Sequence, residues 1–170
     1  APYLCGYGGD IFAIVWDGER LHGINGSGRS PAELGGRSAS DYGPTSVTVP
    51  GAVRLWADLA ERFGTAGLDV AVGAAGDAAA GGVVCTPRVG DKWARAERAP
   101  MPAPAVGAKY ALPELASTLR RIAEDGPAAL YEGELAAAIA AACWLDEADL
   151  AAHRSEWVEP LKRRYRGVDV

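Results

Sequence analysis

The sequence predicts an α/β fold of the α+β kind, in which short strands near the start of the chain are followed by helices. An apolar run at residues 11–16 precedes the turn dipeptide Asp17-Gly18 and a second short apolar segment at residues 21–24, which is typical of a β-hairpin. After Pro50, apolar side chains recur with the period of a helix instead of every second residue. These two observations place a sheet before a helical region.

Few segments are suited to the sheet. The run at residues 11–16 is apolar on both faces, so we expect it to be a central strand in a sheet covered on both sides. Residues 46–49 are a further strand candidate, residues 83–85 are a weaker one, and the final residues look extended. Such a sheet needs more strands than this chain offers, so we expect other segments to complete it.

Helices are predicted in both halves of the chain. An apolar stripe from Val53 to Phe63 indicates a helix that ends at Gly64. Pro113 suits a first helical position, and Asp146 suits an N-cap. The other expected helical segments cover residues 68–80, 91–98, 113–124, 134–143 and 146–152, with a short segment around Leu130-Tyr131, while three alternate prolines make residues 99–107 an extended connector.

Charge and hydropathy exclude two classes of partner. The chain has 170 residues and a net charge of −5, and its basic clusters at residues 120–121 and 162–166 are too short to neutralise a run of phosphates, so no nucleic acid is expected. The longest apolar stretch, residues 135–145, is about half the roughly 20 residues of a membrane-spanning helix. We therefore expect neither nucleic acid nor membrane as a partner.

No metal site is predicted. The chain has three cysteines, Cys5, Cys85 and Cys143, without metal-ligand or C-x-x-C spacing, and we interpret them as free thiols. Acidic residues gather between residues 132 and 149, and helix caps and solvated helix faces explain them better than a metal cluster does.

The composition indicates a single incomplete domain over residues 1–170. Alanine makes up about a fifth of the chain, large aliphatic residues are scarce, and five Trp and six Tyr offer anchors for a surface that another chain or segment covers. The chain starts without Met and stops in a strand-like segment, so neither end looks like a natural boundary. No signal peptide is visible, which favours the cytoplasm over the periplasm or secretion, although a processed chain would have lost one.

Several sequence blocks follow one another in a recognisable order: Cys5-Gly6-Tyr7-Gly8-Gly9-Asp10, Asn25-Gly26-Ser27-Gly28-Arg29-Ser30-Pro31, residues 46–51, 112–119, 130–133, 149–153, 160–161 and 165–167. Taken together, these blocks resemble the gamma-glutamyltransferase (gamma-glutamyltranspeptidase) family. This resemblance implies an N-terminal-nucleophile hydrolase, whose precursor folds as an αββα sandwich and cuts itself to expose a threonine at the start of a small (beta) subunit. The present chain looks like a segment of the large (alpha) subunit, and the missing small chain would complete the sandwich.

The resemblance implies cleavage of γ-glutamyl amides such as glutathione. The threonine hydroxyl attacks the amide carbonyl, its own amino group acts as base, and the acyl-enzyme passes to water or to an amine. No metal or organic cofactor takes part in this chemistry. Every threonine in the chain is internal, so we expect the catalytic nucleophile, and by resemblance the oxyanion donors, on the small subunit and no catalytic residue in this chain.

The predicted substrate-binding residues are Asn25, Ser27 and Arg29. The family places an arginine that binds the substrate α-carboxylate four residues before a proline, and counting back from Pro31 reaches Ser27, whereas the arginine here is Arg29. Either Arg29 takes over the carboxylate with shifted geometry, or the protein is an acylase of the same family for other acyl amides, such as glutaryl-cephalosporin or oxamate-like substrates. An inactive scaffold or binding remnant is the third hypothesis. Separately from these hypotheses, Arg29 could be a surface arginine in a loop, and Asn25-Gly26 could be only a turn.

Three further features have competing interpretations. The glycine-rich loop at residues 6–9 either forms an anion-binding nest or, as we favour, lets the first strand pack closely against its neighbours. Asp10 either orients the site or satisfies backbone amides. His22 and His153 have no partner motif, and we interpret both as structural.

Overall fold

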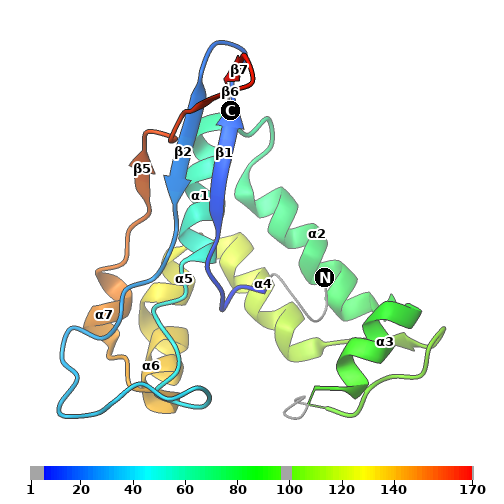
Figure 1. Ribbon diagram of the computed structural model, residues 1–170. Helices are drawn as coiled ribbons and strands as arrows, with labels where there is room; N and C mark the ends of the chain where they lie inside the picture. Colours follow the sequence, from blue (N-terminus) through cyan, green and yellow to red (C-terminus); the bar gives the residue numbers. More distant parts are fainter. Residues whose placement is uncertain (1–5, 97–100, 170) are drawn as a thin grey trace.

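The computed structural model describes residues 6–96 and 101–169, and it shows a group of helices beside and below a small antiparallel sheet (Figure 1). The three-stranded sheet has the order β1-β2-β5, formed by Phe12–Trp16, Leu21–Asn25 and Glu156–Val158. Two short strand pairs are not hydrogen-bonded into this sheet: β3 (Val83–Val84) with β4 (Lys109–Tyr110), and β6 (Arg164–Tyr165) with β7 (Val168–Asp169). The helices are α1 (Ala52–Phe63), α2 (Leu68–Gly81), α3 (Pro87–Ala94), α4 (Pro113–Asp125), α5 (Ala128–Tyr131), α6 (Gly133–Ala142) and α7 (Glu147–Ala151).

The predicted hairpin is confirmed, and its two faces differ. Ala13 pairs with Ile24 and Val15 with His22, so these residues share the face that packs on α1. On the opposite face, Phe12, Ile14 and Trp16 are exposed by 67%, 68% and 60%. The prediction that this strand is central and covered on two sides is therefore wrong for this chain, because β1 is an edge strand of the described sheet and one apolar face of the hairpin is open.

The main core lies where α1, α2, α4, α5, α6 and α7 meet. Tyr131, Leu130, Ile122 and Leu150 are almost completely buried there, and α2 packs along α4 (Figure 1). All the helices predicted in this region are present, with ends within one residue of those expected for α1, α2, α4, α6 and α7. Asp146 caps α7 as predicted, because its side chain accepts from the backbone N–H of Asp149 at 2.7 Å.

A smaller cluster of buried residues sits at the far end of α2, built from Cys85, Val89, Trp93 and Tyr110. Helix α3 begins at Pro87, four residues before the predicted start, because Thr86 caps the N–H of Val89 and proline suits the first turn. It ends at Ala94, so the prediction of a helix to residue 98 is wrong, although residues 97–100 lie outside the described part of the chain. Residues 101–107 contain neither helix nor strand, as the alternate prolines predict.

Residues 46–49 do not form the predicted strand. The carbonyl oxygen of Val47 accepts from the indole N–H of Trp144 at 2.6 Å, and the N–H of Val49 donates to the carbonyl of Arg29 at 3.0 Å. The backbone N–H and C=O groups of these residues therefore form hydrogen bonds with separate segments and not with one neighbouring strand. Cys85 is buried and Cys143 partly buried, both as free thiols, whereas Cys5 lies outside the described residues. Within the described chain, no helix is long and apolar enough to cross a membrane.

Three glycines, Gly26, Gly28 and Gly51, allow the hairpin exit to touch the start of α1. A Cβ atom on Gly28 would overlap the carbonyl oxygen of Val49, and a Cβ atom on Gly51 would overlap the carbonyl oxygen of Gly26. Gly6 and Gly8 have open space at the same position. Close packing is thus a property of these later glycines and not of the loop at residues 6–9, for which it was predicted.

We expect Gly28→Ala to destabilise the protein by about 3 kcal/mol, because the new methyl group has no space and the backbone of Val49 must move. Thermal unfolding of the wild type and the variant measures the effect. Gly73→Ala is the matched control, since nothing lies within 4 Å of its Cβ position in α2, and alanine stabilises a helix relative to glycine by about 1 kcal/mol. Equal unfolding temperatures for Gly28→Ala and Gly73→Ala would contradict the close contact.

Candidate functional site

The turn that follows β2 is fixed by side chains at its own start. The Oδ1 atom of Asn25 accepts from the N–H of Ser27 at 2.8 Å, which is an Asx turn. Asp10 accepts from the N–H of Gly28 at 3.0 Å and from the hydroxyl of Ser27 at 3.4 Å. Asp10 therefore satisfies a backbone amide, the second of its two predicted roles, while Asn25 and Ser27 hold the turn in place.

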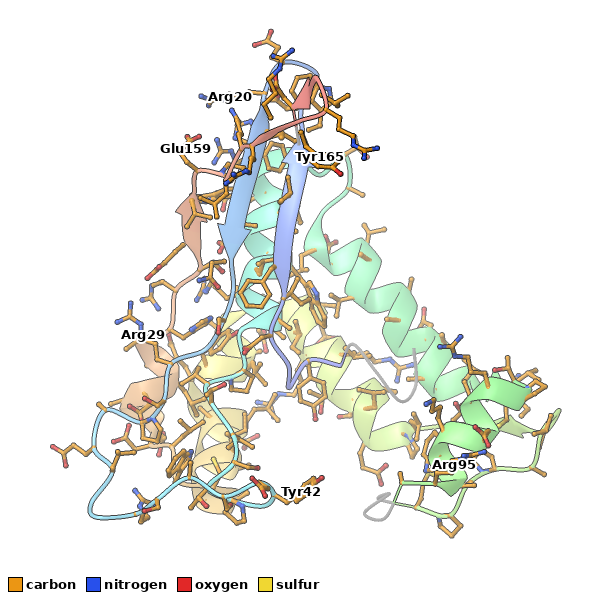
Figure 2. The ribbon with its side chains drawn as sticks, in the orientation of Figure 1. Arg20, Arg29, Tyr42, Arg95, Glu159 and Tyr165 are labelled. Carbon is orange, nitrogen blue, oxygen red and sulfur yellow. The ribbon has the colours of Figure 1, made fainter. Side chains whose placement is uncertain are left out.

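Arg29 has a different partner from Ser27, although the two residues are only two positions apart in the chain. Its side chain is exposed and points outward beside α7 and β5 (Figure 2), where a guanidinium N–H donates to Oε1 of Glu156 at 3.1 Å. An exposed ion pair of this kind contributes little to stability. Arg29 is therefore held at a position where its guanidinium is accessible to a ligand.

A pocket of about 760 Å³ opens between residues 29–33 and α7. Its two walls are joined by one hydrogen bond, in which the N–H of Ala32 donates to Oδ1 of Asp149 at 2.8 Å. The other oxygen of Asp149 accepts from the N–H of Asp146 at 3.1 Å. The pocket thus brings Arg29 together with three acidic residues, Glu33, Asp146 and Asp149.

His153 also lines this pocket, and sequence reasoning did not assign it there. The residue is 4% exposed, and its Nε2 atom is buried without a hydrogen-bond partner among the described residues. Burial lowers the pKa of His153, with a smaller contribution from the cation of Arg54. The only sequence signal was its position after α7, within a block that carried the family resemblance.

His22, the other histidine, has the structural role that was predicted. Its Nε2 atom lies 2.5 Å from Oδ2 of Asp17, and its Nδ1 atom lies 3.2 Å from a guanidinium nitrogen of Arg62. Arg62 in turn stacks on the ring of Trp157 in β5, with 4.1 Å between the guanidinium carbon and the ring centroid. The Asp17 carboxyl accepts hydrogen bonds from the backbone amides of residues 20 and 19 and contacts the side chain of His22. These contacts hold the pKa of the Asp17 carboxyl well below its usual range. These contacts attach the hairpin and β5 to the end of α1.

Tyr131 connects the core to the start of α1. Its hydroxyl donates to the carbonyl of Pro50 at 2.6 Å and accepts from the N–H of Arg54 at 3.1 Å. Its ring lies against the imidazole of His153, with ring centroids 5.5 Å apart. Burial raises the pKa of Tyr131 to about 12, so the side chain stays a neutral phenol at physiological pH.

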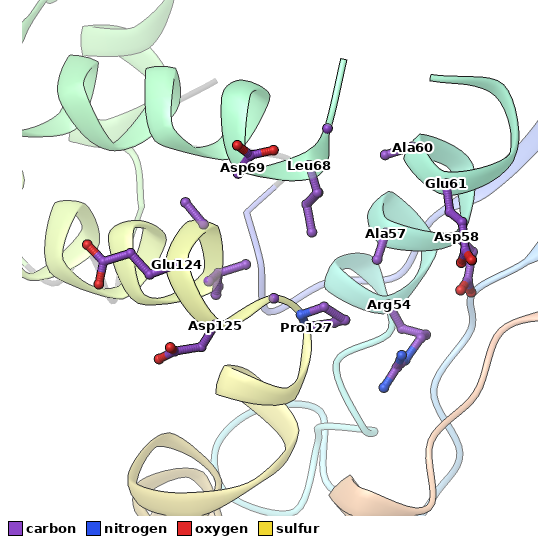
Figure 3. A pocket seen from close by; sticks show the side chains of 14 residues that line it. Arg54, Ala57, Asp58, Ala60, Glu61, Leu68, Asp69, Glu124, Asp125 and Pro127 are labelled. Carbon is purple, nitrogen blue, oxygen red and sulfur yellow. The ribbon is translucent and has the colours of Figure 1, made fainter. Parts of the chain in front are cut away.

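A second pocket of about 570 Å³ lies between α1, α2 and α4, and it is strongly acidic (Figure 3). Its acids are not arranged as ligands. In residues 6–96 and 101–169, no group of three or more histidine, cysteine or acidic side chains could hold a metal ion. The acids that line it are Asp58, Glu61, Asp69, Glu124 and Asp125, and Arg54 is the basic residue among them.

The open face of the hairpin forms an apolar surface with the end of the chain. Phe12 and Ile14 of β1 line a hollow of about 470 Å³ together with Val158, Pro160 and Leu161. Leu161 is 99% exposed. A contiguous apolar surface of this kind is typical of a site where a protein contacts another molecule.

Comparison with known proteins gives consistent matches over nearly the whole chain. The sequence profile of the gamma-glutamyltranspeptidase family matches residues 1–170. The chain is 31% identical over 200 residues to the glutathione hydrolase-like YwrD proenzyme of Bacillus subtilis (strain 168), which covers 99% of this chain and 37% of that protein. It is 34% identical over 146 residues to the acylase ACY 1 proenzyme of Pseudomonas sp. (strain SE83), which covers 75% of this chain and 26% of that protein.

The structural comparison agrees. The cephalosporin acylase from Bacillus halodurans has a similar structure, with a TM-score of 0.85 at 35% identity over 96% of this chain and 37% of that chain. The predicted fold class is therefore confirmed. The present chain spans only 26% to 37% of the length of these three proteins.

We expect Tyr131→Phe to destabilise the protein by about 1–2 kcal/mol, because the variant loses two hydrogen bonds at the start of α1 and leaves the carbonyl of Pro50 without this donor. Urea unfolding measures the change in free energy. Tyr165→Phe serves as the control, since Tyr165 is 63% exposed and contacts Arg166 through its ring. The same midpoint for both variants would show that the Tyr131 hydroxyl does not hold the helix start.

Proposed function

The chain belongs to the gamma-glutamyltranspeptidase family, and on that premise we propose that it is the large-subunit part of an N-terminal-nucleophile amidohydrolase that cleaves γ-glutamyl amides. The family model covers the chain from end to end, and a relative that is 31% identical over 200 aligned residues is named a glutathione hydrolase-like proenzyme. Because the chain spans only part of such proteins, the activity belongs to the whole protein and not to these residues alone.

The proposed reaction uses a threonine at the start of the small subunit. Its hydroxyl oxygen bonds to the amide carbonyl carbon while its own amino group takes the hydroxyl proton. The C–N bond then breaks, the amine leaves with that proton, and the acyl group stays on the threonine as an ester. Water attacks the ester, which releases the acid and restores the hydroxyl, and an amine in the place of water gives acyl transfer.

The contribution of this chain is to bind the acyl group, and the pocket at Arg29 carries that proposal. A γ-glutamyl group ends in an ammonium and a carboxylate on one carbon atom. Arg29 suits the carboxylate, because a guanidinium offers several N–H donors in one plane and its bond to Glu156 uses one of them. Glu33 and Asp146, which line the same pocket, suit the ammonium. The charges of the pocket thus complement both ends of a zwitterion.

A second candidate function is acylase activity on acyl amides that lack the amino group, such as glutaryl amides. Two observations favour it. Two similar proteins, at 34% and 35% identity, are named as acylases. The arginine of this chain also lies two residues after the position that the family resemblance implies, so a substrate carboxylate would meet it from a different direction.

We propose that the small subunit covers the open apolar face of the hairpin. Phe12, Ile14 and Trp16 are large apolar residues exposed side by side on β1, whose outer edge pairs with no other described strand. Exposed aromatic and aliphatic side chains in such a row are typical of an interface core. Covering this face would also give the sheet the second apolar layer that the sequence predicts.

We expect the full protein to contain a second chain that begins with threonine and to release p-nitroaniline from γ-glutamyl-p-nitroanilide. Arg29→Gln should raise KM for this substrate by roughly 10–100-fold, because a hydrogen-bonded charge pair with the carboxylate is lost. Arg95→Gln is the matched control, since Arg95 is also an exposed arginine with one acidic partner and lies at the far end of the molecule (Figure 2). Intact mass and steady-state kinetics provide the readouts.

Three outcomes distinguish the candidate functions. Turnover of γ-glutamyl anilide with the expected loss in Arg29→Gln supports the main proposal. Turnover of glutaryl anilide alone supports the acylase function in its place. A single uncleaved chain without turnover of either substrate would leave only an inactive scaffold.

We further expect Ile14→Glu to reduce turnover at least about tenfold and to reduce co-purification of the two chains, because it places an unpaired charge in an apolar interface. Val70→Glu is the control, since Val70 is also an exposed aliphatic residue, at 58%, but belongs to α2 and not to the hairpin. Wild-type turnover and normal pairing of the chains in Ile14→Glu would show that this face is not the interface.

A further inference from the structure

We infer that Glu156 is a positioning residue, which holds the guanidinium of Arg29 at the margin of the open face of the hairpin, where the guanidinium receives the acyl carboxylate. The inference rests on the proposed function, because it concerns the arginine that is proposed to bind this carboxylate. It adds a residue of β5 to those that determine which acyl groups bind. Glu156 acts through Arg29 and not through a contact with the substrate.

Glu156 projects from the open face of the sheet. Phe12 of β1 pairs with Asn25 of β2, and Asn25 pairs with Glu156 of β5. Residues that pair directly in this way have their side chains on the same face of an antiparallel sheet. Phe12 is 67% exposed on the open face, so the side chain of Glu156 starts from that face as well. Glu156 therefore belongs to the open face and also contacts the arginine of the pocket.

The backbone and the side chain of Arg29 are held by different groups. Its carbonyl accepts from the N–H of Val49 at 3.0 Å, which fixes the backbone of a segment that is neither helix nor strand. An arginine side chain has several rotatable bonds, so a fixed backbone does not by itself fix the guanidinium. Its Nη2 atom donates to Oε1 of Glu156 at 3.1 Å, and the backbone of Glu156 is paired with β2. A residue in the sheet thus determines where the charge of Arg29 lies.

The bond to Glu156 leaves the guanidinium able to bind a second carboxylate. It joins one nitrogen atom to one oxygen atom, whereas a guanidinium has five N–H donors in one plane. The side chain of Arg29 is 81% exposed, so a ligand can reach the other donors. A guanidinium that is held before the ligand arrives loses less conformational entropy on binding. Glu156 therefore favours binding of the carboxylate and does not compete with it.

The ion pair has little effect on the stability of this chain, because both side chains are exposed and water screens their charges. Its position on the open face matters in the full protein, since the small subunit is proposed to cover that face. Charges that are shielded from water attract one another more strongly. We therefore expect the loss of Glu156 to change substrate affinity and not folding.

Three anilides test the inference on the full protein. The γ-glutamyl anilide carries both ammonium and carboxylate, the glutaryl anilide carries only the carboxylate, and the 4-aminobutyryl anilide carries only the ammonium. We expect Glu156→Ala to raise KM about fivefold for the first two substrates, with little change in kcat, and to leave KM for the third unchanged. An acid that merely competed for Arg29 would have the opposite effect, and its removal would lower KM.

Three further variants separate positioning from other effects. Glu156→Gln keeps an acceptor oxygen at the same reach and should restore part of the affinity. Glu156→Ala should change nothing further in an Arg29→Gln background, because the group through which it acts is then absent. Asp91→Ala is the matched control, since Asp91 is also an exposed acid with one arginine partner, Arg95, at 2.8 Å, and it should leave all three KM values unchanged.

The inference would be overturned by an unchanged or lower KM for the carboxylate substrates in Glu156→Ala, or by equal changes for all three anilides. An equal rise in KM in the presence and absence of the Arg29 guanidinium would also overturn it. Thermal unfolding of Glu156→Ala should match that of the wild type, which excludes structural damage as the cause of the change.

Calorimetric titration of the full protein with L-glutamate and with glutarate gives a readout that needs no turnover. A Kd about fivefold higher in Glu156→Ala than in the wild type supports the inference even if no anilide is cleaved and the proposed function fails. An unchanged or lower Kd in the variant, or no binding of either compound to the wild type, overturns it. Anilide turnover together with that second result would leave the proposed function standing.

Discussion

The backbone contact between the hairpin exit and the start of α1 is the constraint on which the rest of the structure depends. At Gly28 and Gly51 the backbones approach so closely that no side chain fits. The carbonyl of Gly9 accepts the N–H groups of Gly51 and Ala52 at 3.1 and 2.9 Å, so the first strand and the first helix share one junction. Arg29 directly follows Gly28 in the chain. The position of its backbone is therefore set by this backbone packing and not by contacts of its own side chain.

Tyr131 lies in the core and contacts both this junction and the residues that line the pocket. Its hydroxyl bonds both sides of the junction between Pro50 and Arg54, and its ring supports His153. A single buried phenol thus links the start of α1 to the pocket wall formed by α7 and His153, and Asp149 of α7 links that wall to the segment after Arg29. The pocket is shaped by elements far apart in the sequence, which explains why no local motif marks it.

The sequence was sufficient where one physical signal dominated. The hairpin and α1 follow from periodicity and turn residues, and the start of α7 follows from the cap at Asp146. It failed where tertiary contacts decide. Residues 46–49 have strand-like composition but give their hydrogen bonds to Arg29 and Trp144. His153 has no local partner, so its place in the pocket depends on the fold of α7 against residues 29–33.

One face of β1 is open and the other packs toward α1. This difference suggests how substrate binding and bond breaking are divided between the two chains of the proposed enzyme. An antiparallel sheet commonly leaves one face to water, but that face is then polar, whereas the open face of β1 carries Phe12, Ile14 and Trp16. A partner that covers this face would also bring its nucleophile to the sheet that positions the acyl pocket. Binding groups such as Arg29 would then be on one chain and the bond-breaking group on the other. In this arrangement, changes at Arg29 alter which acyl group is selected and leave the chemistry of the threonine unchanged. In the proposed arrangement, a family that keeps one nucleophile could change its substrate through a few residues after β2. Arg29, which lies two residues after the position that the family resemblance implies, would be such a change.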